Sequence, residues 1–354
     1  MKRILIFLTK YEDQGASSRL RSIQYFPYFE RDGFLVKHYP LISNAELQNK
    51  YDKKNYSLIY FIKAYLKRVA ILLKSSGSDI IVIEKEAFPW IPFIFEFPFL
   101  FSKKFILDYD DAIFDNYQSH KYKLVNLILG NKIKKLIKKS RLTICGNQYL
   151  CSYAKKAGSN NVLFLPTVID VNKYSVEEAP EKSFIPTIVW IGSPSTIHYL
   201  YSLKDVFIKL ANNHDFKLRV IGDLNFNIES VSIENIKWSE DTEINEILNC
   251  DIGIMPLNNS QWELGKCGYK LIQYMGCGLP VVASKVGANL DIINQNIDGF
   301  LVSSDNEWLS MLSKLISNPK LRDELGKNGK DKIRIFFNLQ TTSKVYIDSL
   351  KELN

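Results

Sequence analysis

The sequence of 354 residues is poor in cysteine and histidine, with five of the first and four of the second. It contains no C-x-x-C pair, and no histidine stands at metal-ligand spacing from a cysteine. This pattern excludes a disulfide framework and the common zinc sites, and it is typical of a reduced, cytosolic protein. A Ser-His-Asp order and a nucleophile elbow are also absent from the sequence.

Long hydrophobic runs are absent as well. The most apolar segment, residues 89–101, is too short to cross a bilayer and is interrupted by Glu96 and by prolines. The N-terminal run MKRILIFLTK is short, has no small-residue cleavage site and is interrupted by Lys10. We therefore expect it to be a first β-strand rather than a signal peptide, and we expect no transmembrane helix.

The length and composition predict a globular protein with about two domains. Hydrophobic residues make up 46% of the chain, which is enough for two buried cores. The net charge of +8 indicates an anionic partner, which could be a membrane surface, a phosphorylated substrate or nucleic acid. No RNA-binding, helix-turn-helix or zinc-finger signature accompanies the lysines, so no nucleic-acid partner is expected.

Short apolar runs alternate with longer helical patterns in both halves of the chain, which is typical of βαβ units and parallel sheets. The pattern predicts an α/β protein with two doubly wound, Rossmann-like domains. The polar stretch 176–183 is the best linker between them. We expect strands at 3–8, 79–83, 105–107, 142–145, 187–191, 217–221, 252–255 and 280–283.

The most informative segment is residues 266–284, KCGYKLIQYMGCGLPVVAS. It joins a loop with glycine, an amphipathic helix, a Gly-Leu-Pro turn and an apolar strand. Lys266, Lys270 and Gln273 have helical spacing, which predicts one shared face for an anion, and a helix start at 266–268 favours a phosphate or diphosphate. The alternative is a surface helix with solvated lysines.

Two further loops follow expected strands. Gly192, Ser193 and Ser195 follow the strand IVWI, where the backbone can approach a diphosphate and the hydroxyls can donate to it. A plain turn with Ser195 as N-cap is the alternative, and both can hold together.

The sequence GASSRLR, residues 15–21, follows the first strand, and its candidate acceptor-binding residues are Gly15, Ser18, Arg19 and Arg21. Arginines in a first helical turn oppose the helix dipole, so an anion there would explain them, although solvated arginines are equally common.

Residues 122–142 form a basic amphipathic pattern. Val125, Leu129, Ile133, Leu136 and Ile137 share one side, and Lys132, Lys134, Lys135, Lys138 and Lys139 share the other. Such a helix can lie on an anionic membrane, and the aromatic segment 88–101 beside it favours that interpretation. The alternative is a core-packed helix with a solvated lysine face.

The run KCGYKLIQYMGCGLPVVASKVGANLDIINQNIDGFLV resembles the donor-binding region of GT-B glycosyltransferases of family 4, a group that includes bacterial enzymes of polysaccharide and lipid-glycan assembly. Other segments match in the expected order, namely LDYDDAIFD, CGNQYLCSYA, LPTVIDVNKY, IVWIGSPSTIHYL and DIGIMPL. The resemblance implies the GT-B architecture, in which two Rossmann-like domains with parallel sheets face across the active cleft. It implies an acceptor domain at 1–175, a linker at 176–186, a nucleotide-sugar domain at 187–337, and a helix at 338–354 that packs back on the first domain.

The chain departs from this family at the donor site. Family 4 enzymes carry a Glu, seven residues and a second Glu, and alignment places Gly265 and Gln273 at these positions. Gln273 could still bind ribose hydroxyls. Sugar contacts are left to Glu263, Lys266 or backbone groups, with Cys267 and Gly268 beside them. Arg219 would lie near the donor on its strand end, or else be a surface arginine.

The sequence DYDD, residues 108–111, has two interpretations. An Asp-x-Asp pair binds a divalent ion in the other large glycosyltransferase architecture, but here the donor-like segment lies far downstream. Alignment instead places Asp110 near a cleft histidine of the family, where a carboxylate could orient or deprotonate the acceptor hydroxyl. Helix capping or pairing with lysines remains the alternative. We predict Asp110, Lys270 and Lys266 as catalytic residues, with the lysines stabilising the leaving diphosphate.

The resemblance implies an enzyme that transfers a sugar from a nucleotide-diphosphate sugar to a hydroxyl of a glycan or lipid-linked acceptor, in cell-surface polysaccharide biosynthesis. It implies retention of anomeric configuration and no metal cofactor. We expect a cytoplasmic protein, peripheral on the inner face of the membrane through helix 122–142. A nucleotide-sugar epimerase of the same fold, or a non-catalytic homologue that binds membrane or glycan, is the alternative.

Overall fold

The computed structural model describes residues 3–51, 57–174 and 184–353, and the chain divides into two compact units. Unit 1 runs to Thr167 and also includes Leu264–Cys267 and the C-terminal stretch from Leu339. Unit 2 consists of Val168–Glu263 and Gly268–Asn338. This division differs from the expected boundary at residue 175, and residues 176–183 of the expected linker lie outside the described residues.

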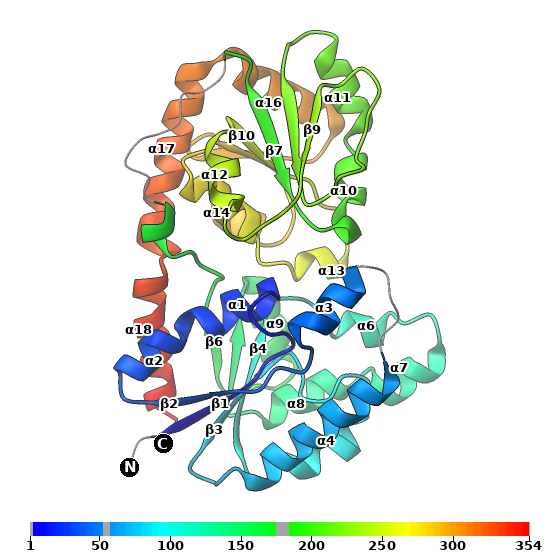
Figure 1. Cartoon of the computed structure of the whole chain (residues 1–354), viewed down its shortest axis with the longest axis vertical. Coiled ribbons are helices and arrows are strands. Elements are labelled where there is room, and N and C mark those ends of the chain that lie inside the picture. Colours follow the sequence, from blue (N-terminus) through cyan, green and yellow to red (C-terminus); the bar gives the residue numbers. More distant parts are fainter. Residues whose placement is uncertain (1–2, 52–56, 175–183, 354) are drawn as a thin grey trace. The chain divides into compact units, whose positions relative to one another are not determined.

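Unit 1 contains a six-stranded parallel sheet in the order β2-β1-β3-β4-β5-β6 (Figure 1). The strands are β1 (Ile4–Leu8), β2 (Leu35–His38), β3 (Ile80–Glu84), β4 (Lys104–Tyr109), β5 (Leu142–Cys145) and β6 (Val162–Phe164). The helices are α1 (Ala16–Arg21), η1 (Ile23–Tyr25), α2 (Phe26–Arg31), α3 (Asn44–Tyr51), α4 (Leu58–Lys74), α5 (Phe93–Glu96), η2 (Phe97–Phe99), α6 (Asp115–Gln118), α7 (Lys123–Leu129), α8 (Lys132–Lys139), α9 (Gln148–Lys156) and α18 (Leu339–Lys351).

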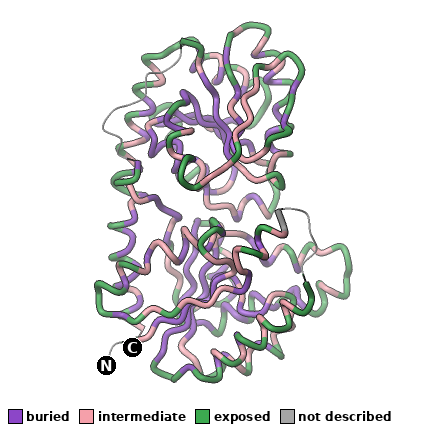
Figure 2. Tube along the Cα trace, viewed as in Figure 1, coloured by how far each residue is buried: buried purple, intermediate pink, exposed green. Residues whose placement is uncertain are grey.

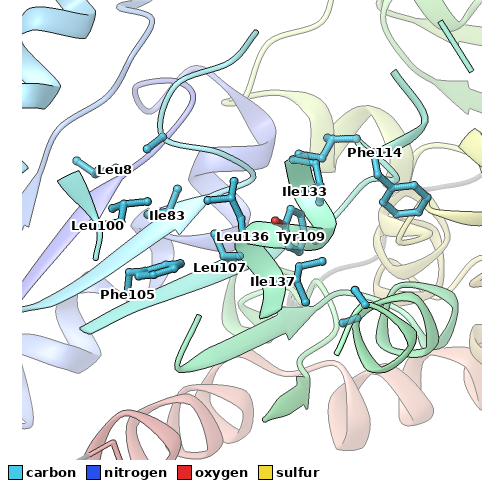
Figure 3. Close-up of a cluster of buried hydrophobic side chains, with 14 of the residues drawn as sticks. Leu8, Ile83, Leu100, Phe105, Leu107, Tyr109, Phe114, Ile133, Leu136 and Ile137 are labelled. Carbon is cyan, nitrogen blue, oxygen red and sulfur yellow. The ribbon is translucent and has the colours of Figure 1, made fainter. Parts of the chain in front are cut away.

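Helices cover this sheet and bury its apolar strands. On one face, Leu107 of β4 belongs to the same buried cluster as Leu136 and Ile137 of α8 (Figure 3). Elsewhere in unit 1, Tyr346 of α18 packs against Tyr25 and Phe29, with ring centroids 5.4 and 5.1 Å apart. These aromatic contacts hold the C-terminal helix in unit 1, because fully buried ring pairs contribute both area and edge-to-face attraction.

Unit 2 contains a second six-stranded parallel sheet, in the order β12-β11-β10-β7-β8-β9. The strands are β7 (Thr187–Ile191), β8 (Lys217–Ile221), β9 (Ile233–Ile236), β10 (Ile252–Met255), β11 (Val281–Ser284) and β12 (Gly299–Val302). The helices are η3 (Val171–Tyr174), η4 (Pro194–Thr196), α10 (His198–Tyr201), α11 (Lys204–Ala211), α12 (Glu243–Leu248), α13 (Gln261–Leu264), α14 (Tyr269–Gly276), α15 (Asn289–Ile292), α16 (Asp305–Ser317) and α17 (Pro319–Phe336).

The core of unit 2 lies between its sheet and the helices α11 and α16, which pack against each other. Phe207 of α11 and Leu312 of α16 are fully buried there beside Ile254 of β10. Figure 2 shows the same pattern in both units, with buried strands inside and exposed residues on the helices and loops. Each unit thus has its own hydrophobic core, as an independent domain requires.

The predicted basic helix over 122–142 is two helices rather than one. α7 ends at Leu129 and α8 begins at Lys132, with Gly130 and Asn131 between them. Four residues of the predicted apolar side are buried, namely Leu129, Ile133, Leu136 and Ile137, and Val125 is half-buried against the same core. Lys132 does not lie on the basic side. It is fully buried, and its ammonium nitrogen lies 2.7 Å from Glu86 Oε2 and 2.9 Å from Glu96 Oε2.

Candidate functional site

In parallel α/β sheets, ligands bind beyond the carboxyl ends of the strands, and these ends carry the polar clusters of both units. In unit 1, β3 ends at Glu84 and Asp110 follows β4 directly. Ser17 of α1 lies between these carboxylates, with its hydroxyl oxygen 2.6 Å from Glu84 Oε1 and 2.7 Å from Asp110 Oδ2. Three elements therefore bring one hydroxyl and two carboxylates together at the predicted catalytic residue.

Lys85 supplies the positive charge of this cluster. Its ammonium nitrogen lies 2.9 Å from Asp110 Oδ1 and 2.8 Å from Asp111 Oδ2. Burial alone would raise the pKa of Asp110, but Lys85 and the Ser17 hydroxyl lower it below its usual value. Burial alone would lower the pKa of Lys85, yet its two carboxylate partners raise it well above the usual range. Asp110 is therefore an ionised hydrogen-bond acceptor with low basicity.

Glu84 completes the cluster and anchors the loop after β1. Its Oε2 accepts hydrogen bonds from the Ser18 hydroxyl at 2.5 Å and from the backbone N–H of Lys10 at 3.0 Å. Burial and the nearby charge of Lys85 lower the pKa of Lys10. Sequence reasoning missed Glu84, Lys85 and Lys10. The signal that could have found them is the charged triplet Glu-Lys-Glu directly after the expected strand 79–83, because that position lies at the carboxyl edge of the sheet.

The predicted acceptor-binding residues separate into two groups. Gly15 caps α1, and a Cβ there would lie 2.2 Å from Tyr11 Cβ, so the loop requires glycine. Ser18 is buried and bonds Glu84 and the N–H of Tyr11, and Arg19 donates a hydrogen bond to the carbonyl of Asp13. These three residues lie within two positions of Ser17 in the sequence and stay candidates for shaping an acceptor site.

Arg21 does not project from the first turn as predicted. It is buried, its Nη2 lies 2.6 Å from Asp108 Oδ1, and its Nη1 donates to the carbonyl of Leu165 at 2.6 Å. Burial raises the pKa of Asp108 to about 6, against the opposing effect of Arg21. Asp108 is thus held by Arg21, and Asp110 and Asp111 are held by Lys85, so the carboxylates of the DYDD sequence face cations of the chain itself.

The segment Leu264–Cys267 belongs to unit 1, whereas the residues on both sides of it belong to unit 2. The side-chain amide of Asn147 donates to the carbonyls of Leu264 and Lys266 at 3.0 and 2.9 Å. The Cys267 thiol lies 3.0 Å from the carbonyl oxygen of Asp110, and burial raises its pKa well above the usual value. Lys266 and Cys267 therefore pack with Asn147 and Asp110 of unit 1, directly before Gly268, where unit 2 resumes.

Gly265, which stands where the family has its first Glu, is required by packing. A Cβ at this position would lie 2.4 Å from the backbone nitrogen of Ala112 and 2.5 Å from its Cβ. Real Cβ atoms do not approach backbone atoms so closely. A Glu side chain at this position would therefore clash with Ala112 in unit 1.

The predicted donor corner of unit 2 centres on Lys270 and Gly192. Lys270 stands in the first turn of α14 with its ammonium 4.5 Å from the ring centroid of Trp190. A Cβ on Gly192 would lie 2.8 Å from this ammonium, and a Cβ on Gly222 would lie 1.9 Å from the Gly192 carbonyl oxygen. Gly192 follows β7 and Gly222 follows β8, so these two glycines let the strand ends approach each other closely beside the lysine.

Neighbouring groups add donors to this corner. Ser193 and Ser195 follow Gly192, and their hydroxyl oxygens lie 2.8 Å apart. Gly268 is the N-cap of α14 in the left-handed region, with φ of 66°. The helix begins at Tyr269, so Lys266 precedes it and the predicted helical face of Lys266, Lys270 and Gln273 is wrong.

Gln273 points into unit 2 rather than along an exposed anion face. It is 2% exposed, and its amide nitrogen donates to Glu243 Oε1 at 3.1 Å and to the Tyr174 hydroxyl at 3.2 Å. The other oxygen of Glu243 accepts the indole N–H of Trp238 at 2.7 Å. A carboxylate from α12 therefore stands beside the position where the family carries its second Glu, which the sequence pattern did not reveal.

Two other predicted donor residues have partners within unit 2. Glu263 is buried in α13 and accepts hydrogen bonds from the hydroxyls of Tyr199 and Ser260. Arg219 lies in the middle of β8, and its guanidinium forms ion pairs with Glu234 at 2.9 Å and Glu246 at 3.1 Å. Its guanidinium therefore pairs with carboxylates of the same unit.

Comparison with known proteins gives a family match over the region that contains Gly192 and Lys270. Residues 185–318 match the family model for glycosyl transferases of group 1. An uncharacterised glycosyltransferase of Methanocaldococcus jannaschii, MJ1178, is 27% identical over 139 residues, which are 36% of this chain and 38% of that protein. The chain thus matches well under half the length of that curated relative.

Solved structures match nearly the whole chain. Sucrose-phosphate synthase from Thermosynechococcus elongatus has a TM-score of 0.75 at 13% identity and covers 99% of both chains. HepE from Anabaena, in complex with UDP and glucose, has a TM-score of 0.70 at 14% identity over 99% of this chain and 100% of its own. The chain therefore has the GT-B fold, and its residues 185–318 match the model of group 1 glycosyl transferases.

Proposed function

We propose that this protein is a glycosyltransferase that moves a sugar from a nucleotide-diphosphate sugar to a hydroxyl of a glycan or lipid-linked acceptor. The observation that carries the proposal is the Lys270–Gly192 corner at the end of β7, inside the matched family region. One solved structure that is similar to this chain holds UDP and glucose, which supports a donor of the same class.

The donor half of the reaction rests on charge. When the sugar leaves, negative charge develops on the diphosphate, and groups already aimed at that position stabilise it. The ammonium of Lys270 and the N-terminus of α14 supply positive charge, and the glycine backbone at 192 permits close approach. The Trp190 ring restricts the lysine, so less conformational freedom is lost when the diphosphate binds.

The acceptor half rests on Asp110. Its carboxylate is ionised, because Lys85 and Ser17 lower its pKa, and its side chain keeps 13% of its surface exposed. An ionised carboxylate accepts the hydrogen bond of an acceptor hydroxyl and directs the oxygen lone pair toward the anomeric carbon. Ser17 and Lys85 hold this carboxylate in one orientation.

We further propose that the reaction retains anomeric configuration and does not use a divalent metal. In support of the second point, Lys270 and the helix start already provide positive charge for the diphosphate. The carboxylates at 108, 110 and 111 are engaged by Arg21 and Lys85 instead. We propose that this transfer takes place at the inner face of the membrane and serves cell-surface polysaccharide assembly.

The test is release of nucleotide diphosphate from a panel of UDP-, GDP- and dTDP-sugars, with and without EDTA and with membrane extract as the source of acceptor. We expect release that survives EDTA and rises with extract. Lys270→Met should reduce it by about 100-fold, and Lys209→Met, an exposed lysine of α11, should not. Release abolished by EDTA would contradict metal independence. Interconversion of donor sugars without release would indicate an epimerase, and no reaction with any donor would indicate a binding protein.

A further inference from the structure

One side of unit 1 exposes large hydrophobic residues in an unusual concentration. Within the described ranges, thirteen of the twenty-four exposed large hydrophobic residues fall between Leu58 and Ile128. They lie on α4, on the segment around α5 and η2, and on or just before α7, and Figure 2 shows the exposed residues along these helices. They are Leu58, Ile59, Ile62, Leu66, Leu73, Trp90, Ile94, Phe95, Phe101, Tyr122, Leu124, Leu127 and Ile128.

The outward face of α4 is fixed by polar contacts on its inward face. Arg68 is buried and donates hydrogen bonds to the carbonyls of Thr9 and Ala87, and the Tyr65 hydroxyl donates to the carbonyl of Pro89 at 2.6 Å. The helix therefore cannot rotate to bury its other side. Leu58, Ile62, Leu66 and Leu73, at spacings of four, four and seven residues, share the exposed face.

The elements that carry these residues adjoin one another. α4 packs against η2, α5 packs against α8, and α8 packs against α7. The ammonium of Lys135 lies 5.8 Å from the Phe93 ring centroid, and that of Lys139 lies 5.9 Å from the ring centroid of Phe97. Figure 1 shows α4, α7 and α8 on the same side of unit 1. We call the exposed residues of 58–74, 90–101 and 121–139 the apolar–basic surface.

The charge of this surface has one sign. The sequence has no Asp or Glu from residue 57 to 78 or from 116 to 169, and the acidic residue of α5, Glu96, is fully buried. Nine lysines of the surface are exposed: Lys63, Lys67, Lys74, Lys121, Lys123, Lys134, Lys135, Lys138 and Lys139. Like charges oppose pairing with a second copy of the same face, whereas they attract an anionic layer.

We infer that the apolar–basic surface docks the protein onto an anionic lipid bilayer. Leucine and isoleucine side chains of α4 and α7 enter the boundary between headgroups and acyl chains, and the lysines contact the headgroup phosphates. The docking is peripheral, since no helix in the described part of the chain is long and apolar enough to span a bilayer. This inference extends the membrane-linked part of the proposed function, and it moves the contact from the predicted helix 122–142 to a surface that includes α4.

The test is co-sedimentation of the full chain with vesicles, which requires no sugar transfer and so can fail or succeed independently of the proposed enzyme activity. We expect binding to vesicles that mix phosphatidylcholine with phosphatidylglycerol, weak binding to phosphatidylcholine alone, and loss of binding in high salt. The variant Ile62→Gln/Leu66→Gln/Leu127→Gln should weaken binding roughly tenfold or more. The matched control Leu224→Gln/Ile297→Gln/Ile335→Gln replaces exposed residues of unit 2 and should bind like the wild type.

A second pair of variants separates charge from hydrophobicity. Lys63→Gln/Lys67→Gln/Lys74→Gln on α4 should reduce binding to the mixed vesicles and its salt dependence, and Lys204→Gln/Lys209→Gln/Lys217→Gln in unit 2 should leave both unchanged. Equal binding by both variants of a pair would overturn the inference. The inference would also be overturned if the wild type did not bind vesicles but instead self-associated or bound RNA, and if the Ile62/Leu66/Leu127 variant lost that association.

Discussion

The ammonium nitrogen of Lys85 lies 2.9 Å from Asp110 Oδ1, in a cluster that also contains Asp111, Ser17 and Glu84. The lysine has a φ of 64°, a left-handed backbone conformation that ordinary residues adopt rarely and at an energetic cost. A strained backbone at the end of a central strand indicates that the position of this ammonium matters. The ion pair, together with the Ser17 hydroxyl, lowers the pKa of the predicted catalytic carboxylate.

Replacing Lys85 with Met should change the pH dependence of transfer. Because Lys85 lowers the pKa of Asp110, its removal leaves burial to raise that pKa, and the carboxylate becomes protonated at a higher pH. We expect turnover to fall roughly tenfold near neutral pH and the acid limb of the rate profile to move to higher pH. The profile of nucleotide diphosphate release, measured under saturating donor, checks this.

Lys104→Met is the matched control, since Lys104 lies at the opposite end of β4. Its profile should follow the wild type. A Lys85→Met enzyme with an unshifted acid limb would show that Asp110 does not set the profile.

Gly265→Ala should destabilise unit 1, and Gly265→Glu should not restore a family-like site. A Cβ at this position meets the backbone of Ala112, which cannot move as a flexible side chain can. We expect a loss of about 1–3 kcal/mol in the free energy of unfolding for either variant, measured by urea denaturation. Gly77→Ala is the control, because a Cβ there meets nothing within 4 Å. Higher transfer activity in Gly265→Glu would mean that the loop accommodates the carboxylate.

The sequence predicted the interior of both sheets and missed their edges. The eight expected strands correspond to β1, β3, β4, β5, β7, β8, β10 and β11, which are the interior strands. The four missed strands, β2, β6, β9 and β12, are the edge strands. Interior parallel strands are buried on both faces and read as continuous apolar runs, whereas strands such as LVKH and IENI are partly exposed and carry polar residues.

The candidate site was predicted in part for a related reason. Glycines and lysines after apolar strands, such as Gly192 and Lys270, can be found in the sequence because strand ends are recognisable. Partners that come from distant segments cannot be found this way, as for Glu243 beside Gln273 or Asn147 beside Lys266. Arg21 and Lys132 were misplaced because helical spacing alone does not show that a long cation is buried against a carboxylate.

Because of Asp108, the free energy of unfolding of the protein should fall as the pH rises from about 4 to about 6. Its pKa is raised from 3.8 to about 6 in the folded state, so the folded chain holds a proton in this window that the unfolded chain has lost. The stabilising contribution is complete below the unfolded pKa and disappears as the pH passes the folded one. A shift of this size corresponds to about 3 kcal/mol.

The measurement is the difference in unfolding free energy between wild type and Asp108→Asn across that pH range. Only the wild type should show this loss, because asparagine does not titrate. Asp251→Asn provides a comparison at another buried aspartate. Parallel curves for wild type and Asp108→Asn would contradict the raised pKa.

Exchanging the side chains of Gln273 and Glu243 should cost little stability, whereas replacing Gln273 alone with Glu should cost more. Gln273→Glu places two carboxylates where an amide now donates to Glu243 Oε1 at 3.1 Å, and burial prevents water from separating them. We expect a loss of about 1–3 kcal/mol in unfolding free energy. In Glu243→Gln/Gln273→Glu the new amide at 243 can accept the Trp238 N–H and donate to the new carboxylate, so most of the loss should be recovered.

Glu246→Gln is the control, because Glu246 lies on the same helix but pairs with Arg219. It should show no such recovery when combined with Gln273→Glu. Additive losses in the exchanged pair would mean that the two side chains do not interact in solution.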